Sequence, residues 1–225
     1  MQLQWIPAQQ VQSKEAFLIL ASAFKQNASG ISSASNSATA NNVGSTCFLV
    51  ETPALINASL SEVSSAFFDG NKDIALQLFE AVKNNMFALV DGILVDQKQA
   101  CISRLGDLFT EIEWLLHDKP VRAFPYYKDQ IVCTGAVLAS ALFYHFLLEQ
   151  GVDAVFVDIR DCIVTSDDFG EAGVLEPITL SRLQQTFIPG RTHVTQAGIG
   201  ATDQNENATL SAEGNDWVQQ TIKGL

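Results

Sequence analysis

The sequence predicts an α/β protein, a three-layer α/β/α sandwich around a mostly parallel central sheet. Three observations support this fold class: short apolar runs typical of buried strands recur along the chain, helical patterns lie between them, and Gly or Pro stands at several junctions. Parallel strands need long crossover connections, which the helical patterns provide. With 225 residues, 47% of them hydrophobic, the chain is long enough to bury such a core, and we expect residues 1–225 to form a single domain.

The first half of the chain predicts two strands and a large helical section. Residues 1–6 form an opening strand, and Ser13 then caps a helix whose apolar residues recur at helical spacing. Residues 26–46, rich in Ser, Asn, Ala and Gly, predict an exposed, flexible loop. The apolar run at residues 47–50 predicts the second strand.

A helical subregion at residues 57–118 follows the second strand. Its longest patterns cover residues 73–94 and 96–117, where apolar residues alternate steps of three and four. Pro120 and Pro125 are expected to close it.

The second half returns to alternating elements. Residues 129–133 predict a strand, residues 134–150 a helix that Gly151 ends, and residues 154–158 another strand. Together they form an expected βαβ unit, which implies parallel pairing. The remaining expected elements are a helix at 177–185, a strand at 193–199 and a last helix from Gly214 onward.

Composition excludes several partners. A formal charge of -12 argues against nucleic acid and anionic membrane surfaces, because both attract clustered Lys and Arg. The longest apolar run, residues 139–148, is too short to cross a bilayer of roughly 30 Å. The four cysteines form no CxxC pair and the chain opens without a secretion signal, so we predict a cytoplasmic protein.

Residues with metal-binding or nucleophilic chemistry show no site pattern. The three histidines are isolated, and His145, among apolar helix residues, is expected to be a hydrogen-bonded core residue. Asp167 and Asp168 could serve a magnesium ion, but loop carboxylates are usually solvated. Cys133, at an expected helix start, is read as a buried structural cysteine in preference to a reactive thiol.

Two segments carry a motif-level signal. One is TSDDFGEA at residues 165–172; the other, residues 192–217, begins THVTQAGIG and ends ATLSAEGNDW. Together they resemble the core of the aspartokinases, of the amino acid kinase family. The resemblance spans nearly the whole chain but only the amino-acid-binding portion of an aspartokinase. It therefore implies an amino acid kinase-like sandwich, truncated before the nucleotide-binding lobe.

The resemblance breaks down where the family's residues bind ligand. In place of the family's Lys-Phe-Gly-Gly-Thr-Ser, this chain has WIPAQQ at residues 5–10. The family lysine is a cation facing the nucleotide phosphates, and the glycines let backbone amides approach them. Trp5 carries no charge, and Pro7 has no N–H to donate. After the second strand, Glu51 replaces a hydroxyl and would repel a phosphate or an acidic substrate.

Two more substrate contacts of the family are replaced. Ala136 stands where a glutamate holds the substrate's amino group, and Val164 where an arginine clamps its carboxylate. The spacing around these positions is kept, which is typical of a repurposed site. The resemblance thus implies a vestigial substrate-binding site with no catalytic residue and no metal. Its expected residues are Gly135, Thr165, Asp167, Gly214 and Asp216.

Three functional hypotheses follow. The first is a catalytically degenerate aspartokinase-like domain that binds a small amino-acid-like ligand or associates as a homo- or hetero-oligomer, without cofactor or phosphoryl transfer. The second is an active kinase for aspartate or a relative, using ATP and Mg, completed by another chain or by a C-terminal lobe. The third is a purely structural subunit that pairs through its long helices.

Overall fold

A computed structural model describes residues 1–22 and 46–225. Its central sheet has four strands in the order β1-β2-β4-β3, and all neighbouring strands are parallel. A separate antiparallel pair, β5 and β6, follows β4. The strands are β1 (Gln2–Ile6), β2 (Thr46–Val50), β3 (Ala154–Phe156), β4 (Thr192–Gln196), β5 (Ile199–Ala201) and β6 (Asn207–Thr209).

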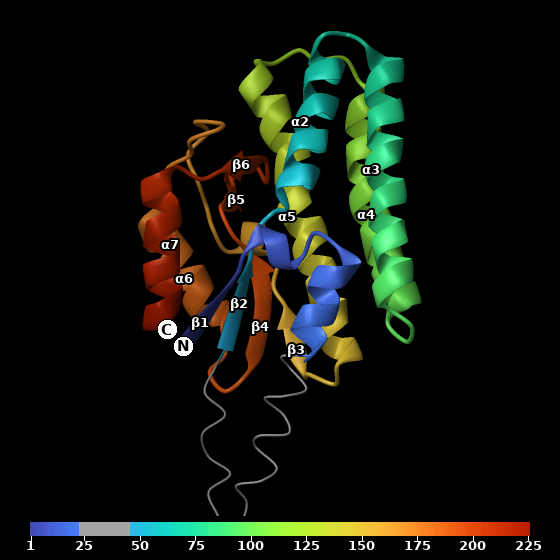
Figure 1. Ribbon diagram of the computed structural model, residues 1–225. Helices are drawn as coiled ribbons and strands as arrows, with labels where there is room; N and C mark the ends of the chain where they lie inside the picture. The colour runs from blue at the N-terminus through green and yellow to red at the C-terminus, as the bar shows by residue number, and fades with distance from the viewer. Residues whose placement is uncertain (23–45) are drawn as a thin grey trace, which may run out of the picture.

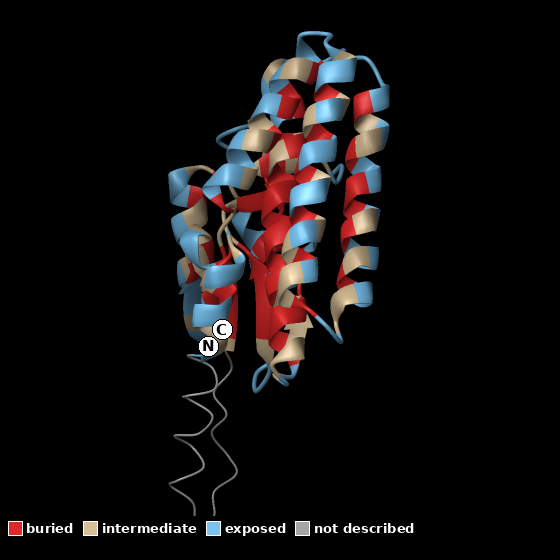
Figure 2. Cartoon of the chain, turned by 45° about the vertical axis from the view of Figure 1, so that its right-hand side comes forward, coloured by how far each residue is buried: buried red, intermediate tan, exposed pale blue. Residues whose placement is uncertain are grey.

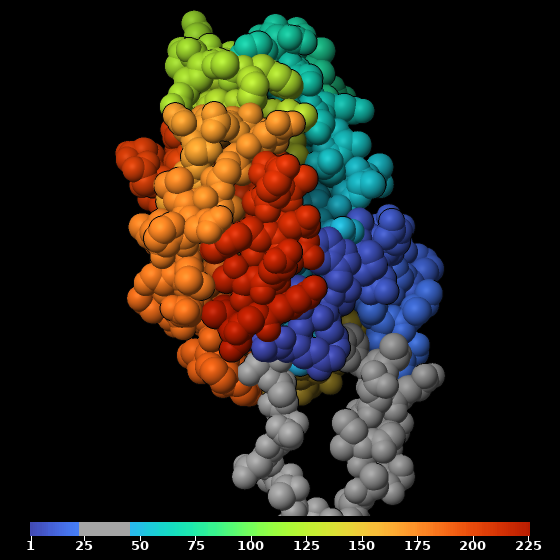
Figure 3. All heavy atoms as spheres, turned by 90° about the vertical axis from the view of Figure 1, so that its left-hand side faces the viewer, coloured from blue at the N-terminus to red at the C-terminus, as the bar shows by residue number. Residues whose placement is uncertain are grey.

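Helices cover both faces of the sheet (Figure 1). One face is covered by α5 (Phe124–Glu149) and by a helix that begins at residue 14. As expected, Ser13 caps that helix, because its Oγ accepts a hydrogen bond from Ala16 N at 3.2 Å. The other face is covered by α6 (Glu176–Thr186) and α7 (Ala212–Gly224), and α7 lies in the middle of the surface in Figure 3. The predicted α/β sandwich with a parallel sheet is confirmed.

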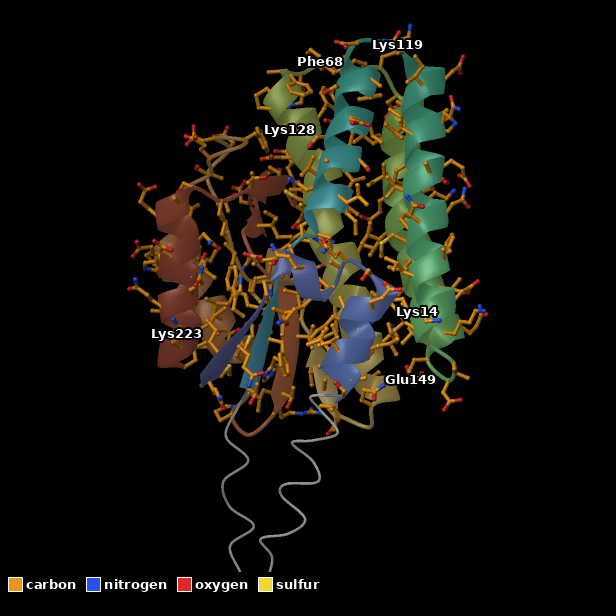
Figure 4. All side chains as sticks on the ribbon, viewed as in Figure 1. Lys14, Phe68, Lys119, Lys128, Glu149 and Lys223 are labelled. Atoms are coloured by element: carbon orange, nitrogen blue, oxygen red, sulfur yellow. The ribbon has the colours of Figure 1, made fainter. Side chains whose placement is uncertain are left out.

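Three more long helices extend beyond the carboxyl ends of the strands (Figure 1). They are α2 (Ala54–Phe68), α3 (Lys72–Ile93) and α4 (Lys98–His117). Two of them, α2 and α4, pack against α5, and the third, α3, packs against α2 and α4. At the turn between α3 and α4, the Glu149 carboxylate (Figure 4) accepts hydrogen bonds from three consecutive amides, Val95, Asp96 and Gln97. The end of α5 thereby supplies acceptors for the amides of the turn that leads into α4.

The core is centred on α5, whose buried residues continue into those of the sheet (Figure 2). By length and composition alone, α5 could cross a membrane. However, 83% of its most apolar window is buried inside this protein. A helix that the sheet and other helices cover on all sides is apolar all round, as a membrane-spanning helix is. We therefore interpret α5 as the core helix of this protein.

One expected strand is wrong. Residues 129–133 lie within α5, and Pro125 stands in the first turn of that helix instead of closing the section before it. Proline is tolerated there because the first amides of a helix have no intrahelical partner. The apolar run at 129–133 resembles a strand because a fully buried helix shows no single apolar stripe.

The other expected strands and helices occur in the described segments, with boundaries shifted by a few residues. Gly70 and Gly151 both follow helix ends with positive φ angles of 79° and 78°, as expected for helix-ending glycines. The expected flexible loop at 26–46 lies outside the described residues, apart from Thr46, which begins β2.

Candidate functional site

The loops after β1, β2 and β4 meet at one edge of the sheet. These strands end at Ile6, Val50 and Gln196, and the carboxyl ends of parallel strands lie together. In open α/β sheets, ligands bind at this edge. The motif positions singled out in the sequence lie in these loops and in the elements packed around them.

The loop after β1 is closed by a carboxylate of the chain itself. Pro7 precedes a short 3-10 helix, η1 (Ala8–Gln10), and the Ala8 amide donates a hydrogen bond to Glu51 Oε2 at 3.0 Å. Trp5, which stands where the resemblance implies a lysine, is 37% exposed. One of the amides that corresponds to the family's phosphate-binding turn is therefore already bonded to an internal anion.

Gly135 lies in a helix contact and not on an open surface. A Cβ at this position would come within 2.9 Å of Thr52 Cγ2 and 3.0 Å of Leu60 Cδ1. The glycine thus allows α5 to pack closely against the start of α2. Ala136, next to it, is fully buried, so the position where the resemblance implies a substrate-binding glutamate belongs to the core.

The TSDDFGEA segment forms a loop fixed by backbone hydrogen bonds. Thr165 is buried, and its amide donates to Ala201 O at 2.9 Å. Its hydroxyl has no hydrogen-bond partner among the described residues. Asp167 is exposed on the outer side of the loop. Val164, where the resemblance implies an arginine, is 2% exposed and faces the interior.

Asp129 is the polar residue that holds this loop, and sequence reasoning missed its role. It is 2% exposed on α5 and accepts hydrogen bonds from Gly170 N at 2.7 Å, Thr209 N at 2.9 Å and Thr209 Oγ1 at 2.8 Å. Buried carboxylates are stable only when hydrogen-bonded in this way. One side chain therefore fastens the loop and β6 to the core helix.

The tail motif is also retained for packing. Gly214 is buried in the first turn of α7, where its amide donates to the capping Ser211 Oγ at 3.1 Å. A Cβ there would lie 3.2 Å from Val174 Cγ2. Gly200 is tighter still, because a Cβ would come within 3.0 Å of Ile163 O. Asp216, in contrast, is exposed on α7.

A cavity of about 430 Å³ opens beside the loop, between α2 and the first half of α5. We call it the cleft. Lys128, labelled in Figure 4, lines it and is exposed, without an ion-pair partner in the described parts of the chain. The other lining residues are Asn57, Ser61, Phe124, Pro125, Asp129, Val132, Phe169, Gly170, Glu171 and Thr209.

Asp167 lines a neighbouring cavity of about 490 Å³ on the outer side of Phe169. There the Arg122 guanidinium lies 4.0 Å from the centre of the Tyr126 ring and forms an ion pair with Glu206. Of the predicted site residues, Asp167 alone lines a cavity that we describe. Thr165 is buried at the start of the loop, Gly214 packs against Val174, Gly135 lies in the contact with α2, and Asp216 is on the surface. The predicted residues are thus not gathered in one pocket.

Thiol and metal chemistry find no support in the described segments. Burial, followed by the charge of Asp129, raises the pKa of the Cys133 thiol to about 12, which fits a structural cysteine. Cys133 also lies inside α5 and not at a helix start. In residues 1–22 and 46–225, no three His, Cys, Asp or Glu side chains are grouped so that they could hold a metal ion.

Comparison with known proteins connects this fold to one class of enzyme. No protein-family model matches the chain. It is 25% identical over 143 residues to lysine-sensitive aspartokinase 3 of Escherichia coli (strain K12), a match that covers 62% of this chain and 31% of that protein. The resemblance to the aspartokinases is thereby confirmed at the level of sequence.

Solved aspartokinase structures have the same fold. The chain aligns over 99% of its length with 46% of E. coli aspartokinase III, at a TM-score of 0.75 and 19% identity for the complex with aspartate and ADP (R-state). For the complex with lysine and aspartate (T-state), the TM-score is 0.73 and the identity 18%. Clostridium acetobutylicum aspartate kinase gives a TM-score of 0.64 at 12% identity, over 98% of this chain and 44% of that one. This chain spans less than half the length of the relatives it matches.

Proposed function

We propose that this protein is a catalytically degenerate aspartokinase-like domain, which acts by binding a small amino-acid-like molecule or by associating with other subunits and does not transfer phosphate. The observation that carries the proposal is the hydrogen bond from the Ala8 amide to Glu51 Oε2 at 3.0 Å. It puts a negative charge of the chain beside the turn that corresponds to the family's phosphate-binding loop.

Electrostatics favours this interpretation. Phosphoryl transfer depends on cations and amides that stabilise the transferred group. A phosphate within about 4 Å of the Glu51 carboxylate would be repelled by about 1 kcal/mol in water and by several times more in a partly desolvated cleft. Trp5 and the buried Val164 supply no compensating positive charge.

The cleft supports a binding role better than a catalytic one. Its available charges are the exposed Lys128 and Glu171, since Asp129 is buried and hydrogen-bonded to the loop. Two side chains of opposite charge suit a small zwitterion. We extend the proposal to a cytoplasmic location and to an oligomeric state, for which the long helices α3 and α4 offer extended surfaces.

The proposal is tested by two measurements on the intact chain. A coupled assay for ADP with Mg·ATP and a panel of amino acids should show no amino-acid-dependent turnover, with E. coli aspartokinase III as the positive control. Thermal melts should show no stabilisation by Mg·ATP, whereas an amino-acid-like ligand at 100 times its Kd should add about 2.7 kcal/mol to the free energy of unfolding. Turnover by this chain would refute the proposal.

A double variant tests whether the Glu51 carboxylate and the lack of a lysine at position 5 prevent phosphate binding. Replacing Trp5 by Lys and Glu51 by Ser restores the family's residue types at two positions. Stabilisation by Mg·ATP in the double variant, and none in the wild type, would support the loss of phosphate binding through these residues. Equal stabilisation of both proteins would contradict it.

The second candidate is an active amino acid kinase completed by a further polypeptide. It is favoured by one observation: the chain aligns with less than half of each aspartokinase structure. In that case ATP and Mg would be required, and turnover would arise only when the missing portion is added.

A further inference from the structure

A groove of about 540 Å³ lies on the other side of the core helix from the cleft, between α4, α5 and the end of β3. We call it the α4–β3 groove. Its floor is formed by buried side chains that include Val137 and His145, and its rim by Arg104 and Asp107 of α4 and by Phe156 and Asp158. None of these residues stands at an aspartokinase motif position, so neither the resemblance nor the proposed function accounts for the groove.

Arg104 is a cation held in place without an anion. Its guanidinium carbon lies 4.6 Å from the centre of the Phe156 ring and 5.7 Å from that of Tyr144. Within residues 1–22 and 46–225, no carboxylate forms an ion pair with it. Stacking on aromatic rings fixes the plane of a guanidinium and leaves its N–H edge available. Such an edge matches the two oxygens of a carboxylate.

Asp107 supplies the opposite charge one helical turn further along α4. It is exposed and forms no ion pair with any described residue. Asp158, on the opposite rim, is already neutralised by Arg160 through bonds of 2.9 and 2.7 Å. The groove therefore offers one free guanidinium and one free carboxylate on the same face of a helix.

His145 adds an unpartnered acceptor to the floor. The residue is 5% exposed, and its Nδ1 lies 3.2 Å from Gln97 Oε1, an acceptor, so Nδ1 carries the proton. Burial, and then the charge of Arg104, lower the pKa of His145 to about 4, so the ring is neutral at pH 7. Nε2 is then a lone-pair acceptor, and it has no partner among the described residues. A buried acceptor without a donor is costly and calls for a functional explanation.

We propose that the α4–β3 groove is a second binding site, for an α-amino acid with an apolar side chain. The carboxylate of the ligand would bind the Arg104 edge, and its ammonium group would bind Asp107, above the His145 ring in the floor of the groove. The apolar side chain would lie over Val137 and Phe156. This assignment stands independently of what the cleft binds, because the two sites share no lining residue.

Calorimetry with L-leucine and L-phenylalanine tests the assignment, using the whole chain. Both should bind saturably, and each single-charge analogue, 4-methylpentanoate or 3-methylbutylamine, should bind at least tenfold more weakly than leucine because it leaves one rim charge unpaired. Absence of saturation up to about 10 mM for both amino acids would overturn the proposal, since that corresponds to an affinity too weak for a built site.

Variants distinguish this groove from any other binding surface. Arg104→Gln and Asp107→Asn, both at exposed positions that should fold normally, should each weaken leucine binding about tenfold. Arg191→Gln, at the opposite end of the sheet with its side chain 48% exposed, is the matched control and should bind as the wild type does. In the wild type, leucine should also shift the ¹⁵N resonance of His145 Nε2. Binding unchanged in both groove variants, or a Nε2 resonance that leucine leaves in place, would overturn the assignment.

Discussion

Two segments of the molecule are held in different ways: residues 165–172, which keep the family's residues, and residues 5–10, which have lost them. The first is fastened on several sides: Thr165 to Ala201 O, Gly170 to Asp129, and Ala172 to Thr209 O at 2.8 Å. The second begins in β1, where Trp5 and Ile6 pair with β2 and Ile6 O accepts a hydrogen bond from Glu51 N at 3.0 Å. Beyond Ile6, the Ala8 amide donates to Glu51 Oε2.

The difference explains which residues persist. In the retained loop, and at Gly135, Gly200 and Gly214, a change would disturb backbone bonds or create a steric clash. At positions 5 and 51, the family's ligand-contacting residues could be replaced by Trp5 and Glu51 without disturbing the fold. A kept motif in this chain is thus a mark of its packing and is weak support for activity.

Of the variants that test this comparison between the two segments, Asp129→Ala is expected to have the largest effect. The variant leaves Gly170 N, Thr209 N and the Thr209 hydroxyl without their acceptor in a partly buried place. Since hydrogen bonds to a charged group contribute about 1.5–3 kcal/mol each and do not add fully, we expect the free energy of unfolding to fall by about 3–5 kcal/mol. Urea denaturation followed by circular dichroism measures it.

Asp129→Asn is the conservative partner of that variant. Its amide oxygen can still accept one or two of the hydrogen bonds, so the loss should be roughly half as large. A loss below about 1 kcal/mol for the alanine variant would break the comparison, because the retained loop would then not depend on its buried anchor.

A second test compares two glycines in helices. Gly135→Ala should lower the free energy of unfolding by about 1–2 kcal/mol, because the new Cβ would meet Thr52 Cγ2 at 2.9 Å. Gly106→Ala, in α4 with nothing within 4 Å of the new Cβ, should instead raise it by about 0.5–1 kcal/mol. If both variants changed the free energy of unfolding in the same direction in thermal melts, Gly135 would not be a packing residue.

The sequence predicts most of this fold, for reasons visible in particular segments. The apolar stripes of α3 and α4, which leave one face of each helix exposed to solvent, are local signals in the sequence. So are Gly70 and Gly151, the glycines that follow helix ends. The start of α5 was misread because that helix is buried all round, which removes the periodic pattern.

The site was less predictable than the fold. The resemblance identified which ligand contacts are missing, yet it could not show that Gly135 and Gly214 are packing residues, since a glycine looks alike in both roles. Asp129 has no local signal, because its partners, Gly170 and Thr209, are 41 and 80 residues away. Pairing over such distances depends on tertiary structure alone.

A smaller effect is expected in the replaced loop. Glu51→Ala removes the acceptor of the half-buried Ala8 amide, and we expect a loss of about 1 kcal/mol in the free energy of unfolding. Glu51→Gln, which keeps an acceptor oxygen, should lose less. If Glu51→Ala were as damaging as Asp129→Ala, both loops would be equally dependent on one carboxylate, and the contrast between them would fail.

The smallest effect is expected at Asp216, the predicted site residue that is exposed on α7 and takes part in none of the contacts described above. Asp216→Asn should change the free energy of unfolding by less than about 0.5 kcal/mol, because a solvated surface carboxylate contributes little. Neither packing nor backbone bonding then explains why this aspartate matches the family pattern. If the variant is as stable as the wild type but loses a ligand-dependent rise in Tm, Asp216 is a retained ligand contact, and the rule that kept residues are packing residues has an exception.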